Sequence, residues 1–336
     1  MLVALDAMGG DYGPSETVKG AVEACQEWDL RVILVGPEAL LHAELSKFRG
    51  FPAGRIEIVH AGDVIAMSDH PASAVKKKDK SSLVVANRLV KDGKASAVIS
   101  AGNTGAAMAA SLLTFGRIEG VARPAIAIPM PTLQGVSVLL DAGANSDCTP
   151  ENLYQFAIMG SIYADKVLNI PNPRIGLLNI GEEKTKGNNL TLAAYDILSA
   201  SKLNFIGNIE GMDVHHGKAD VIVCDGFLGN VVLKLSEGLA SALFKMIKSQ
   251  LSSSLLGKIG GLLIKPSLKG LLLRMDYAEY GGAPLLGLKN ISIISHGSSK
   301  ARAIKNAIRV AAKAVGEKLI PTIDSAVTSM KNSGHI

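Results

Sequence analysis

Short apolar runs rich in β-branched residues recur along this chain and alternate with segments of helical periodicity. The runs that predict strands cover residues 2–6, 31–36, 56–61, 97–101, 125–129, 136–141, 175–180, 219–225 and 291–295. Near the C-terminus, Ile304, Ala307, Ile308 and Ala311 follow the three- and four-residue spacing of a helix face. This alternation predicts an α/β fold, a three-layer α/β/α sandwich with a largely parallel central sheet.

Six of the predicted strands end in a polar, glycine-rich turn. Ligands of parallel sheets bind at the carboxyl ends of strands, and glycine lets backbone N–H groups approach an anion closely. One such turn is ordinary loop geometry, so the prediction of a substrate and phosphate site depends on the repetition. The predicted site residues are Asp6, Gly9, Gly10, Asp11, Ser100, Gly102, Asn103, Thr104, Asn145, Asn179, Asp225, Gly229 and His296. The turns match no nucleotide-binding fingerprint, which favours a small anion over ATP or NAD.

Length, composition and charge favour a single large globular domain with an acidic partner. The 336 residues, 48% of them hydrophobic, suffice for one large domain, predicted over residues 1–330 with two lobes possible and a loose tail at 331–336. A formal charge of +5 favours an acidic partner, and with 4% aromatic residues and no nucleic-acid motif we expect no nucleic acid. The first residues resemble a strand rather than a signal peptide, so we expect a cytoplasmic protein.

Metal and cofactor chemistry find little support in the sequence. Three widely spaced cysteines (Cys25, Cys148 and Cys224) form neither a disulfide framework nor a CxxC site. The histidines lack the spacing of metal ligands. We therefore expect no metal and no cofactor.

Residues 251–276 carry a different pattern, which predicts an amphipathic helical arm protruding from the domain. Its apolar positions are Leu255, Leu256, Ile259, Leu262 and Leu263, followed after Pro266 by Leu268, Leu271 and Leu272, with lysine and arginine among them. Because Pro266 and the charges interrupt the segment, it is too short to cross a bilayer but suits binding to an anionic membrane surface. A helical hairpin buried against the body or across a dimer is the alternative.

Eight motifs in this order resemble one family. DAMGGD, SAGNTGA, ARPA, DAGAN, LLNIGEE, DGFLGN, YGGAPLLG and SHGSS, between Asp6 and Ser299, resemble the phosphate:acyl-ACP acyltransferases of bacterial phospholipid synthesis, the PlsX type. The resemblance implies a homodimer with a fold related to isopropylmalate dehydrogenases and phosphotransacetylases. It also implies transfer of a fatty acyl group from acyl carrier protein to inorganic phosphate at the inner face of the cell membrane. A membrane-bound glycerol-3-phosphate acyltransferase would then use the acyl phosphate.

Carried over residue by residue, the resemblance points to Lys184 and Asn230 as catalytic. Lys184 would hold phosphate, and the Asn230 amide would donate a hydrogen bond to the thioester oxygen. On the residues alone, Lys184 has the pattern of a solvated lysine beside two glutamates. Cys148 as a covalent nucleophile is an alternative, but an inert, partly buried thiol is the preferred interpretation.

Two further function classes stay open at the level of sequence. A decarboxylating dehydrogenase of the related fold would need a metal-binding Asp cluster and an NAD loop, and neither is found. A non-catalytic membrane scaffold would not need six polar strand ends. The basic run Lys76, Lys77, Lys78 and Lys80 is either a docking site for an acidic carrier or a solvated turn.

Overall fold

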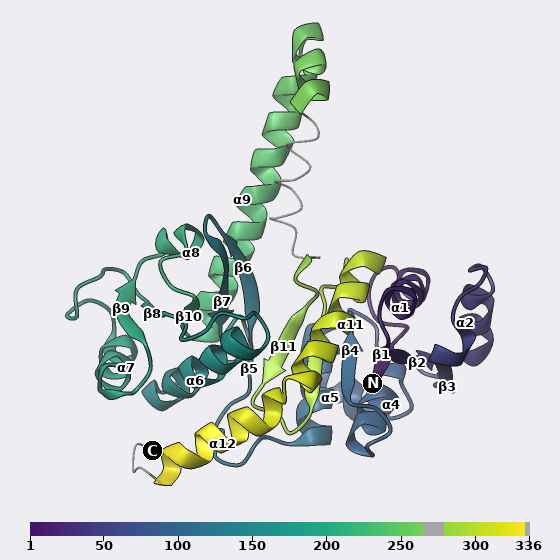
Figure 1. Cartoon of the computed structure of the whole chain (residues 1–336), viewed down its shortest axis with the longest axis horizontal. Helices are drawn as coiled ribbons and strands as arrows, with labels where there is room; N and C mark the ends of the chain where they lie inside the picture. Colours follow the sequence, from purple (N-terminus) through teal and green to yellow (C-terminus); the bar gives the residue numbers. More distant parts are fainter. Residues whose placement is uncertain (265–278, 333–336) are drawn as a thin grey trace.

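Two sheets form the centres of two lobes in the computed structural model, which describes residues 1–264 and 279–332 (Figure 1). The first has the order β3-β2-β1-β4-β12-β11-β5: Ile56–His60, Arg31–Gly36, Leu2–Asp6, Ala97–Ser100, Ile291–Ile294, Ala283–Leu286 and Ala125–Ile126. The second has the order β6-β7-β10-β8-β9: Ile128–Thr132, Gly135–Leu140, Val221–Val223, Ile175–Leu178 and Phe205–Ile209. The α/β class is confirmed, and the expected central sheet is divided in two, with Ala127 joining β5 to β6.

Parallel pairing brings the polar strand ends together in each lobe. β3, β2, β1, β4 and β12 are parallel neighbours, and Ser100 stands in register with both Asp6 and Ile294. In the second sheet, β7, β10, β8 and β9 are parallel, and Leu140 stands beside Val223. Strand β11 and strand β6 pair antiparallel with their neighbours. The turns that follow the parallel strands therefore lie at one edge of each sheet.

Helices cover both faces of each sheet. In the first lobe, α1 (Ser15–Glu27) packs against α11 (Ala301–Gly316), and α4 (Ser82–Lys91) packs against α5 (Thr104–Phe115). In the second, α6 (Pro150–Lys166) contacts α7 (Asn189–Ala200) and β10, while α12 (Leu319–Asn332) crosses from the first lobe to pack on α6 (Figure 1). Shorter helices are α2 (Glu38–Leu45), η1 (Ala53–Arg55), α3 (Pro71–Lys77) and α8 (Asp213–His216). The expected loose tail begins inside α12, and residues 333–336 lie outside the described chain.

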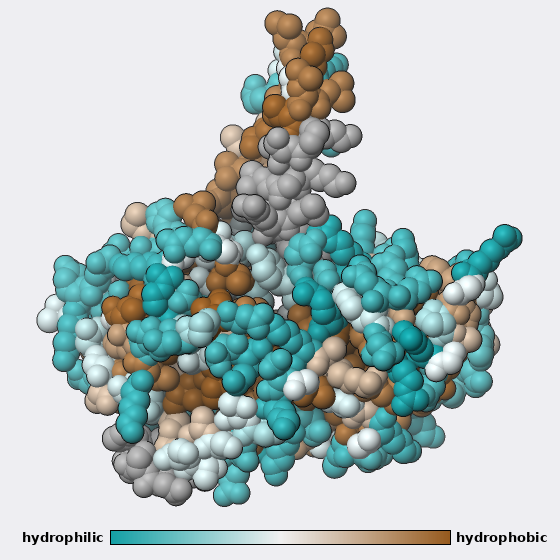
Figure 2. Space-filling model, in the orientation of Figure 1, coloured by the Kyte–Doolittle hydropathy of each residue, from teal (hydrophilic) through white to brown (hydrophobic). Residues whose placement is uncertain are grey.

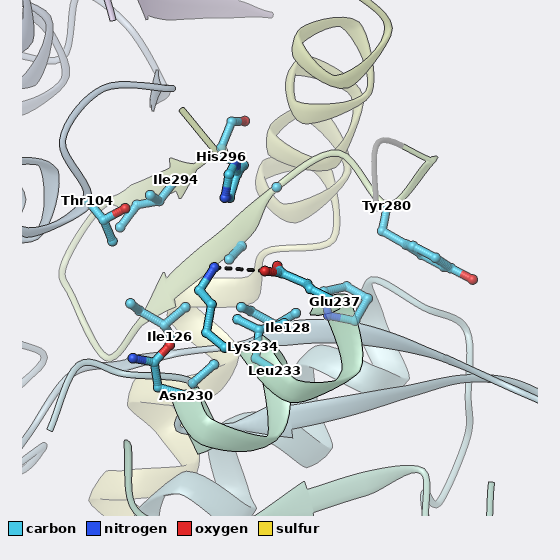
Figure 3. Close-up of a pocket in the computed structure, with 15 residues that line it drawn as sticks. Thr104, Ile126, Ile128, Asn230, Leu233, Lys234, Glu237, Tyr280, Ile294 and His296 are labelled. Carbon is cyan, nitrogen blue, oxygen red and sulfur yellow. Dashed lines mark hydrogen bonds and ion pairs between the residues drawn. The ribbon is translucent and has the colours of Figure 1, made fainter. Parts of the chain in front are cut away.

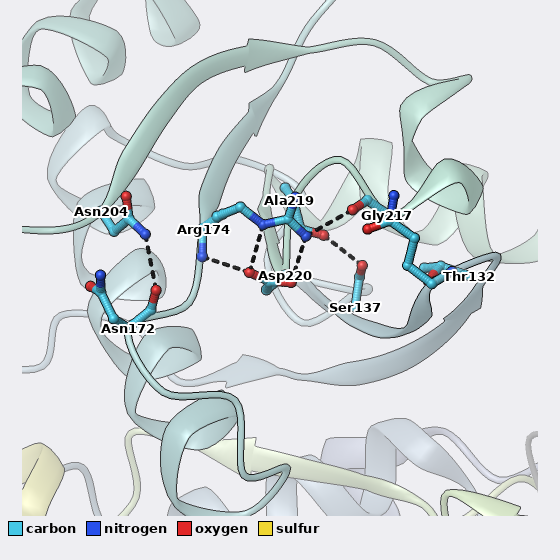
Figure 4. A network of polar contacts seen from close by, with 9 residues as sticks. Thr132, Ser137, Asn172, Arg174, Asn204, Gly217, Ala219 and Asp220 are labelled. Carbon is cyan, nitrogen blue, oxygen red and sulfur yellow. Dashed lines mark hydrogen bonds and ion pairs between the residues drawn. The ribbon is translucent and has the colours of Figure 1, made fainter.

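An ion pair at the amino ends of β8 and β10 holds the edge of the second sheet opposite its polar turns (Figure 4). The Arg174 guanidinium donates to both carboxylate oxygens of Asp220, at 3.0 and 2.9 Å, and to the carbonyl of Gly217 at 2.9 Å. Burial alone would raise the pKa of Asp220, but hydrogen bonds from the Arg174 side chain and backbone bring that pKa below its usual value. The pair thus fixes the sheet without taking part in the candidate site.

A long exposed helix, α9 (Gly226–Ser252), projects from between the lobes (Figure 1). Its large exposed hydrophobic residues include Val231, Leu235, Leu239, Leu243, Met246 and Ile247, and Figure 2 shows the tip as strongly hydrophobic. A short apolar helix, Leu255–Ile264, follows it. The projection therefore begins well before residue 251, where the sequence predicted its start. The predicted arm residues Leu255, Leu256, Ile259, Leu262 and Leu263 are exposed, whereas Leu268, Leu271 and Leu272 lie outside the described residues.

Candidate active site

A pocket of about 170 Å³ lies where β12, the crossover between the sheets and the first turns of α9 meet (Figure 3). It is lined by Thr104, Ile126, Ile128, Pro129, Ala142, Asn230, Leu233, Lys234, Glu237, Tyr280, Gly282, Ala283, Ile294, Ser295 and His296. Residues of both lobes line this pocket, so it exists only where the two lobes meet. Apolar side chains form much of its wall, and polar groups converge from α5, α9 and the end of β12. The pocket thus brings together three predicted site residues, Thr104, Asn230 and His296.

Behind the pocket, the ends of β1 and β4 are joined by a buried carboxylate. Asp6 is 3% exposed and accepts hydrogen bonds from the hydroxyls of Ser82, at 2.6 Å, and Ser100, at 2.7 Å. Burial raises the pKa of Asp6, against the opposing effect of these hydrogen bonds. A Cβ atom on Gly9 would lie 2.8 Å from both the Asp6 carboxylate and the Gly102 nitrogen, so this approach requires glycine. Asp6, Gly9, Ser100 and Gly102 therefore position the strand ends.

The turns that follow β1, β4 and β12 lie between the buried Asp6 network and the pocket. The backbone N–H of Asp11 donates to the Gly297 carbonyl at 2.8 Å, which ties the first turn of the chain to the last. Gly10, which precedes Asp11, has a positive φ of +96°, a conformation that glycine adopts readily. The Asn103 side chain caps α5 by accepting from the Ala106 N–H at 3.0 Å. Helix α5 therefore begins at Thr104, with its positive end at the pocket.

A second buried carboxylate, Asp141, organises the end of β7. One of its oxygens accepts hydrogen bonds from the backbone of Ile126, Gly143 and Ala144, and the other from the backbone and side chain of Asn145. Burial raises its pKa against these hydrogen bonds. Asn145 also donates to the Pro124 carbonyl at 2.8 Å, so this predicted residue acts in positioning the turn. Asp141 was not predicted as a site residue, although a carboxylate directly after an apolar strand was a visible signal.

Helix α9 is seated directly on this turn. Asp225 caps it by accepting from the Leu228 N–H at 2.8 Å. A Cβ atom on Gly229 would overlap the Asp141 carbonyl oxygen, so only glycine fits there. The next residue, Asn230, lies against Gly143. The seat directs residues 230, 233, 234 and 237, spaced as one helix face, into the pocket.

Another face of α9 borders a second pocket of about 320 Å³. Its lining includes the predicted residues Asn179 and Asp225, together with Leu228 and Val232 of α9. The Asn179 side chain donates to the Lys186 carbonyl at 3.0 Å and thereby shapes the turn after β8. Of the predicted site residues, Thr104, Asn230 and His296 therefore line one pocket, and Asn179 and Asp225 line another on a different face of α9. The others line neither pocket.

The two predicted catalytic residues do not lie in the same pocket. Lys184 is on the turn after β8, where its Nζ lies 2.8 Å from Asp196 and 5.5 Å from the centre of the Tyr195 ring. Its hydrogen bond with Asp196 raises its pKa. The lysine beside Asn230 is instead Lys234, which sequence reasoning missed. Its position four residues after Asn230 was the available signal, because helix residues at that spacing share a face.

The structure gives little support for a covalent cysteine nucleophile or for a metal site in the residues that it describes. Burial, followed by the charges of Asp141 and Asp225, raises the pKa of Cys148 to about 11, so its thiol stays protonated near neutral pH. Within residues 1–264 and 279–332, no group of three or more potential metal ligands is present. The arrangement instead suits an acyl chain and an anion brought together beside the positive end of a helix.

Comparisons with known proteins agree in family and in fold. A family model described as "Fatty acid synthesis protein" matches residues 1–321. The phosphate acyltransferase of Pelotomaculum thermopropionicum is 57% identical over 334 residues, covering 99% of this chain and 97% of that protein. The phosphate acyltransferase of Heliobacterium modesticaldum is 57% identical over 327 residues, covering 97% and 98%.

Solved structures with much lower identity share the architecture. A phosphotransacetylase from Streptococcus pyogenes superposes with a TM-score of 0.63 at 18% identity, covering 94% of each chain. A 4-hydroxythreonine-4-phosphate dehydrogenase from Klebsiella pneumoniae gives 0.51 at 16% identity, covering 93% of this chain and 98% of the other. The first likeness confirms the predicted relation to the phosphotransacetylase fold.

Proposed function

Because the chain belongs to the fatty acid synthesis protein family of phosphate acyltransferases, we propose that it transfers a fatty acyl group from acyl carrier protein to inorganic phosphate. The products are acyl phosphate, for phospholipid synthesis, and the free carrier thiol. One observation supports an acyl chain and phosphate as the substrates. The pocket places Asn230, Lys234 and the start of α5 beside an apolar wall, which suits an anion next to an acyl chain.

The reaction requires orientation more than a strong base. A phosphate oxygen attacks the thioester carbonyl carbon, a C–O bond forms, and the C–S bond breaks as the carrier thiolate leaves and takes up a proton. Phosphate is already an anion at neutral pH, so a pocket that holds it against the carbonyl supplies much of the rate. The Asn230 amide, fixed against Gly143, is placed to donate to the carbonyl oxygen as negative charge develops. Ile126, Ile128 and Leu233 offer contacts for the first methylene groups of the acyl chain.

We further propose that the projecting helix binds a membrane surface peripherally. By length and composition alone, α9 is long and apolar enough to cross a membrane, and little of it is buried in the fold. Its first turns, however, are seated on Asp141 and line the pocket. The remaining 15 or so residues from Gly238 to Ser252 extend only about 22 Å, short of the roughly 30 Å hydrocarbon core. Exposed leucines and methionine on this outer part suit the interface at the inner face of the cell membrane.

The remaining partners are those that the family resemblance implies, and surface charge supports the first of them. The exposed Lys76, Lys77 and Lys80 offer a docking site for acidic acyl carrier protein. A second copy of the chain packing along α9 would form the homodimer. A membrane-bound glycerol-3-phosphate acyltransferase is the proposed consumer of acyl phosphate. Charge reversal of the three lysines should raise the KM for the carrier at low salt, and sedimentation with anionic vesicles tests membrane binding.

The decisive assay mixes purified protein with long-chain acyl carrier protein and inorganic phosphate. We expect free carrier thiol and hydroxylamine-sensitive acyl phosphate, both dependent on phosphate. Asn230→Ala should lower turnover by about 100-fold, the magnitude for one oxyanion donor. Asn204→Ala, which removes a hydrogen bond to the Asn172 carbonyl far from the pocket, serves as the matched control. No turnover by folded wild-type protein would favour a scaffold, and NAD-dependent oxidation would favour a dehydrogenase.

A further inference from the structure

We propose that Lys234, Ser295 and the first turn of α5 form the binding site for the phosphate, with Lys234 as its cation. The inference rests on the proposed function and deepens it, because it assigns the phosphate to particular residues. It assigns the phosphate-binding lysine to α9 rather than to the turn after β8. Three independent features of the pocket support it.

The first feature is a buried hydroxyl without a partner. Ser295 lies directly after β12, is 2% exposed and lines the pocket. Its backbone N–H donates to the Ser100 carbonyl at 2.8 Å, which fixes its place. Its side-chain oxygen is buried and has no hydrogen-bond partner among the residues that the structure describes. A buried hydroxyl left unpaired is costly, and an oxygen of a bound phosphate would accept a hydrogen bond from it.

The second feature is the lysine itself. Lys234 and Glu237 both line the pocket, and the Lys234 Nζ lies 2.8 Å from a carboxylate oxygen of Glu237. Figure 3 shows this side chain extending from α9 into the pocket, with its amino group next to the Glu237 carboxylate and its end directed toward the side on which the His296 ring lies. Both partners are partly exposed, with side-chain exposures of 54% and 38%, and such ion pairs are weak. An ammonium group has three donors, so Lys234 can keep Glu237 and still bind an anion.

The third feature is the helix end opposite Lys234. Helix α5 has 12 residues and begins at Thr104, which lines the same pocket. Its backbone N–H groups and dipole favour an anion at this end. Lys234, Ser295 and Thr104 come from three different elements. They surround the pocket with a charge, a hydroxyl donor and a helix N-terminus, the groups that bind a tetrahedral oxyanion.

Lys184 fits this role less well in the structure because of its position. Like Lys234 it is paired with one carboxylate, Asp196, at 2.8 Å and is partly exposed, but it lines neither of the two pockets beside α9. Lys234, by contrast, shares a helix face with Asn230. Phosphate at Lys234 would therefore lie beside the amide proposed to bind the thioester oxygen.

The test measures the KM for phosphate and the KM for acyl carrier protein separately. Lys234→Met keeps the length of the side chain but removes its charge, and we expect at least a tenfold rise in the KM for phosphate with less than a twofold change for the carrier substrate. Lys234→Arg should recover much of the loss, and Ser295→Ala should raise the KM for phosphate several-fold. Lys91→Met, on the exposed surface of α4, is the control for loss of one charge. A phosphate KM within twofold of wild type in Lys234→Met would overturn the proposal.

A second measurement separates this inference from the proposed function. Inorganic phosphate alone should raise the thermal midpoint of the wild-type protein in proportion to the logarithm of its concentration, and this shift should disappear in Lys234→Met. The shift needs no acyl donor, so it decides the inference even if acyl transfer fails. A shift that survives in Lys234→Met but disappears in Lys184→Met would place the phosphate at the turn after β8 and contradict the proposal.

Discussion

The close packing of α9 against the Asp141 turn requires a glycine at position 229. We expect Gly229→Ala to destabilise the protein, because the new Cβ would overlap the Asp141 carbonyl oxygen and crowd the sulfur of Cys224, 3.1 Å away. Alanine is intrinsically better than glycine in a helix by about 1 kcal/mol. Overpacking costs about 1–3 kcal/mol, and here the upper end applies because a backbone carbonyl in a buried turn cannot rotate aside. The net expectation is a loss of about 2 kcal/mol in the free energy of unfolding.

Gly238 provides a matched control on the same helix. A Cβ atom there would meet nothing within 4 Å, so Gly238→Ala gains helix propensity without a clash. We expect it to be neutral or stabilising by up to about 1 kcal/mol. The two variants should therefore differ by about 2–3 kcal/mol in urea unfolding followed by circular dichroism.

The same substitution should impair activity, because Asn230 and Lys234 follow Gly229 on the displaced helix. A shift of about 1 Å in a positioning group costs on the order of 100-fold in rate. Gly238→Ala should keep wild-type turnover in soluble assays. Equal stabilities for the two variants, together with full activity of Gly229→Ala, would refute the close seating of α9.

Further predictions concern the buried carboxylates and the thiol. Arg174→Met should lower the free energy of unfolding by about 1–2 kcal/mol near pH 7. Because Arg174 lowers the pKa of Asp220, this difference should be present at pH values above the usual aspartate pKa and should shrink as the pH of the unfolding assay falls below it. Asp6 has a raised pKa and binds more protons when folded, so Asp6→Asn should gain stability relative to wild type as the pH rises from 4 to 7, and a constant difference would contradict this. Cys148→Ala should keep turnover within twofold, and isolation of an acylated Cys148 would contradict that expectation.

Strand positions were largely predictable because buried parallel strands are continuous apolar runs. The runs at 2–6 and 31–36 coincide with β1 and β2. The run at 125–129 does not form one strand, because the chain leaves one sheet and enters the other at Ala127. Hydrophobicity is the same on both sides of that change, so periodicity could not reveal it.

Two strands were missed for different reasons. β9 (Phe205–Ile209) is an edge strand with a partly exposed pattern and a glycine in its middle, so its apolar signal is weak. β11 (Ala283–Leu286) is short and contains proline, which usually argues against a strand. Its antiparallel pairing with β12 and β5 accommodates it.

The sequence could predict which strand ends contribute to the candidate site, but not which side chains face the pocket. Parallel order alone brings Asp6 and Ser100 together, as expected. Which residues then face the pocket depends on where α9 is seated, a contact between segments about 90 residues apart. Helical spacing could show that Asn230 and Lys234 share a face, but not that this face meets β12.

Helix α9 is one continuous helix that extends from the pocket to the exposed apolar surface. It runs from Gly226 to Ser252 as one helix, about 40 Å long. Glu237 is the last of its residues to line the pocket, and Met246, on the exposed outer part, lies about 14 Å further along the axis. With the outer part on a bilayer, as proposed, acyl phosphate made beside Asn230 would be released within one or two helix diameters of the lipid surface. A reactive product with a long apolar chain would then have only a short aqueous path, because the helix that lines the pocket would also provide the proposed surface for membrane contact.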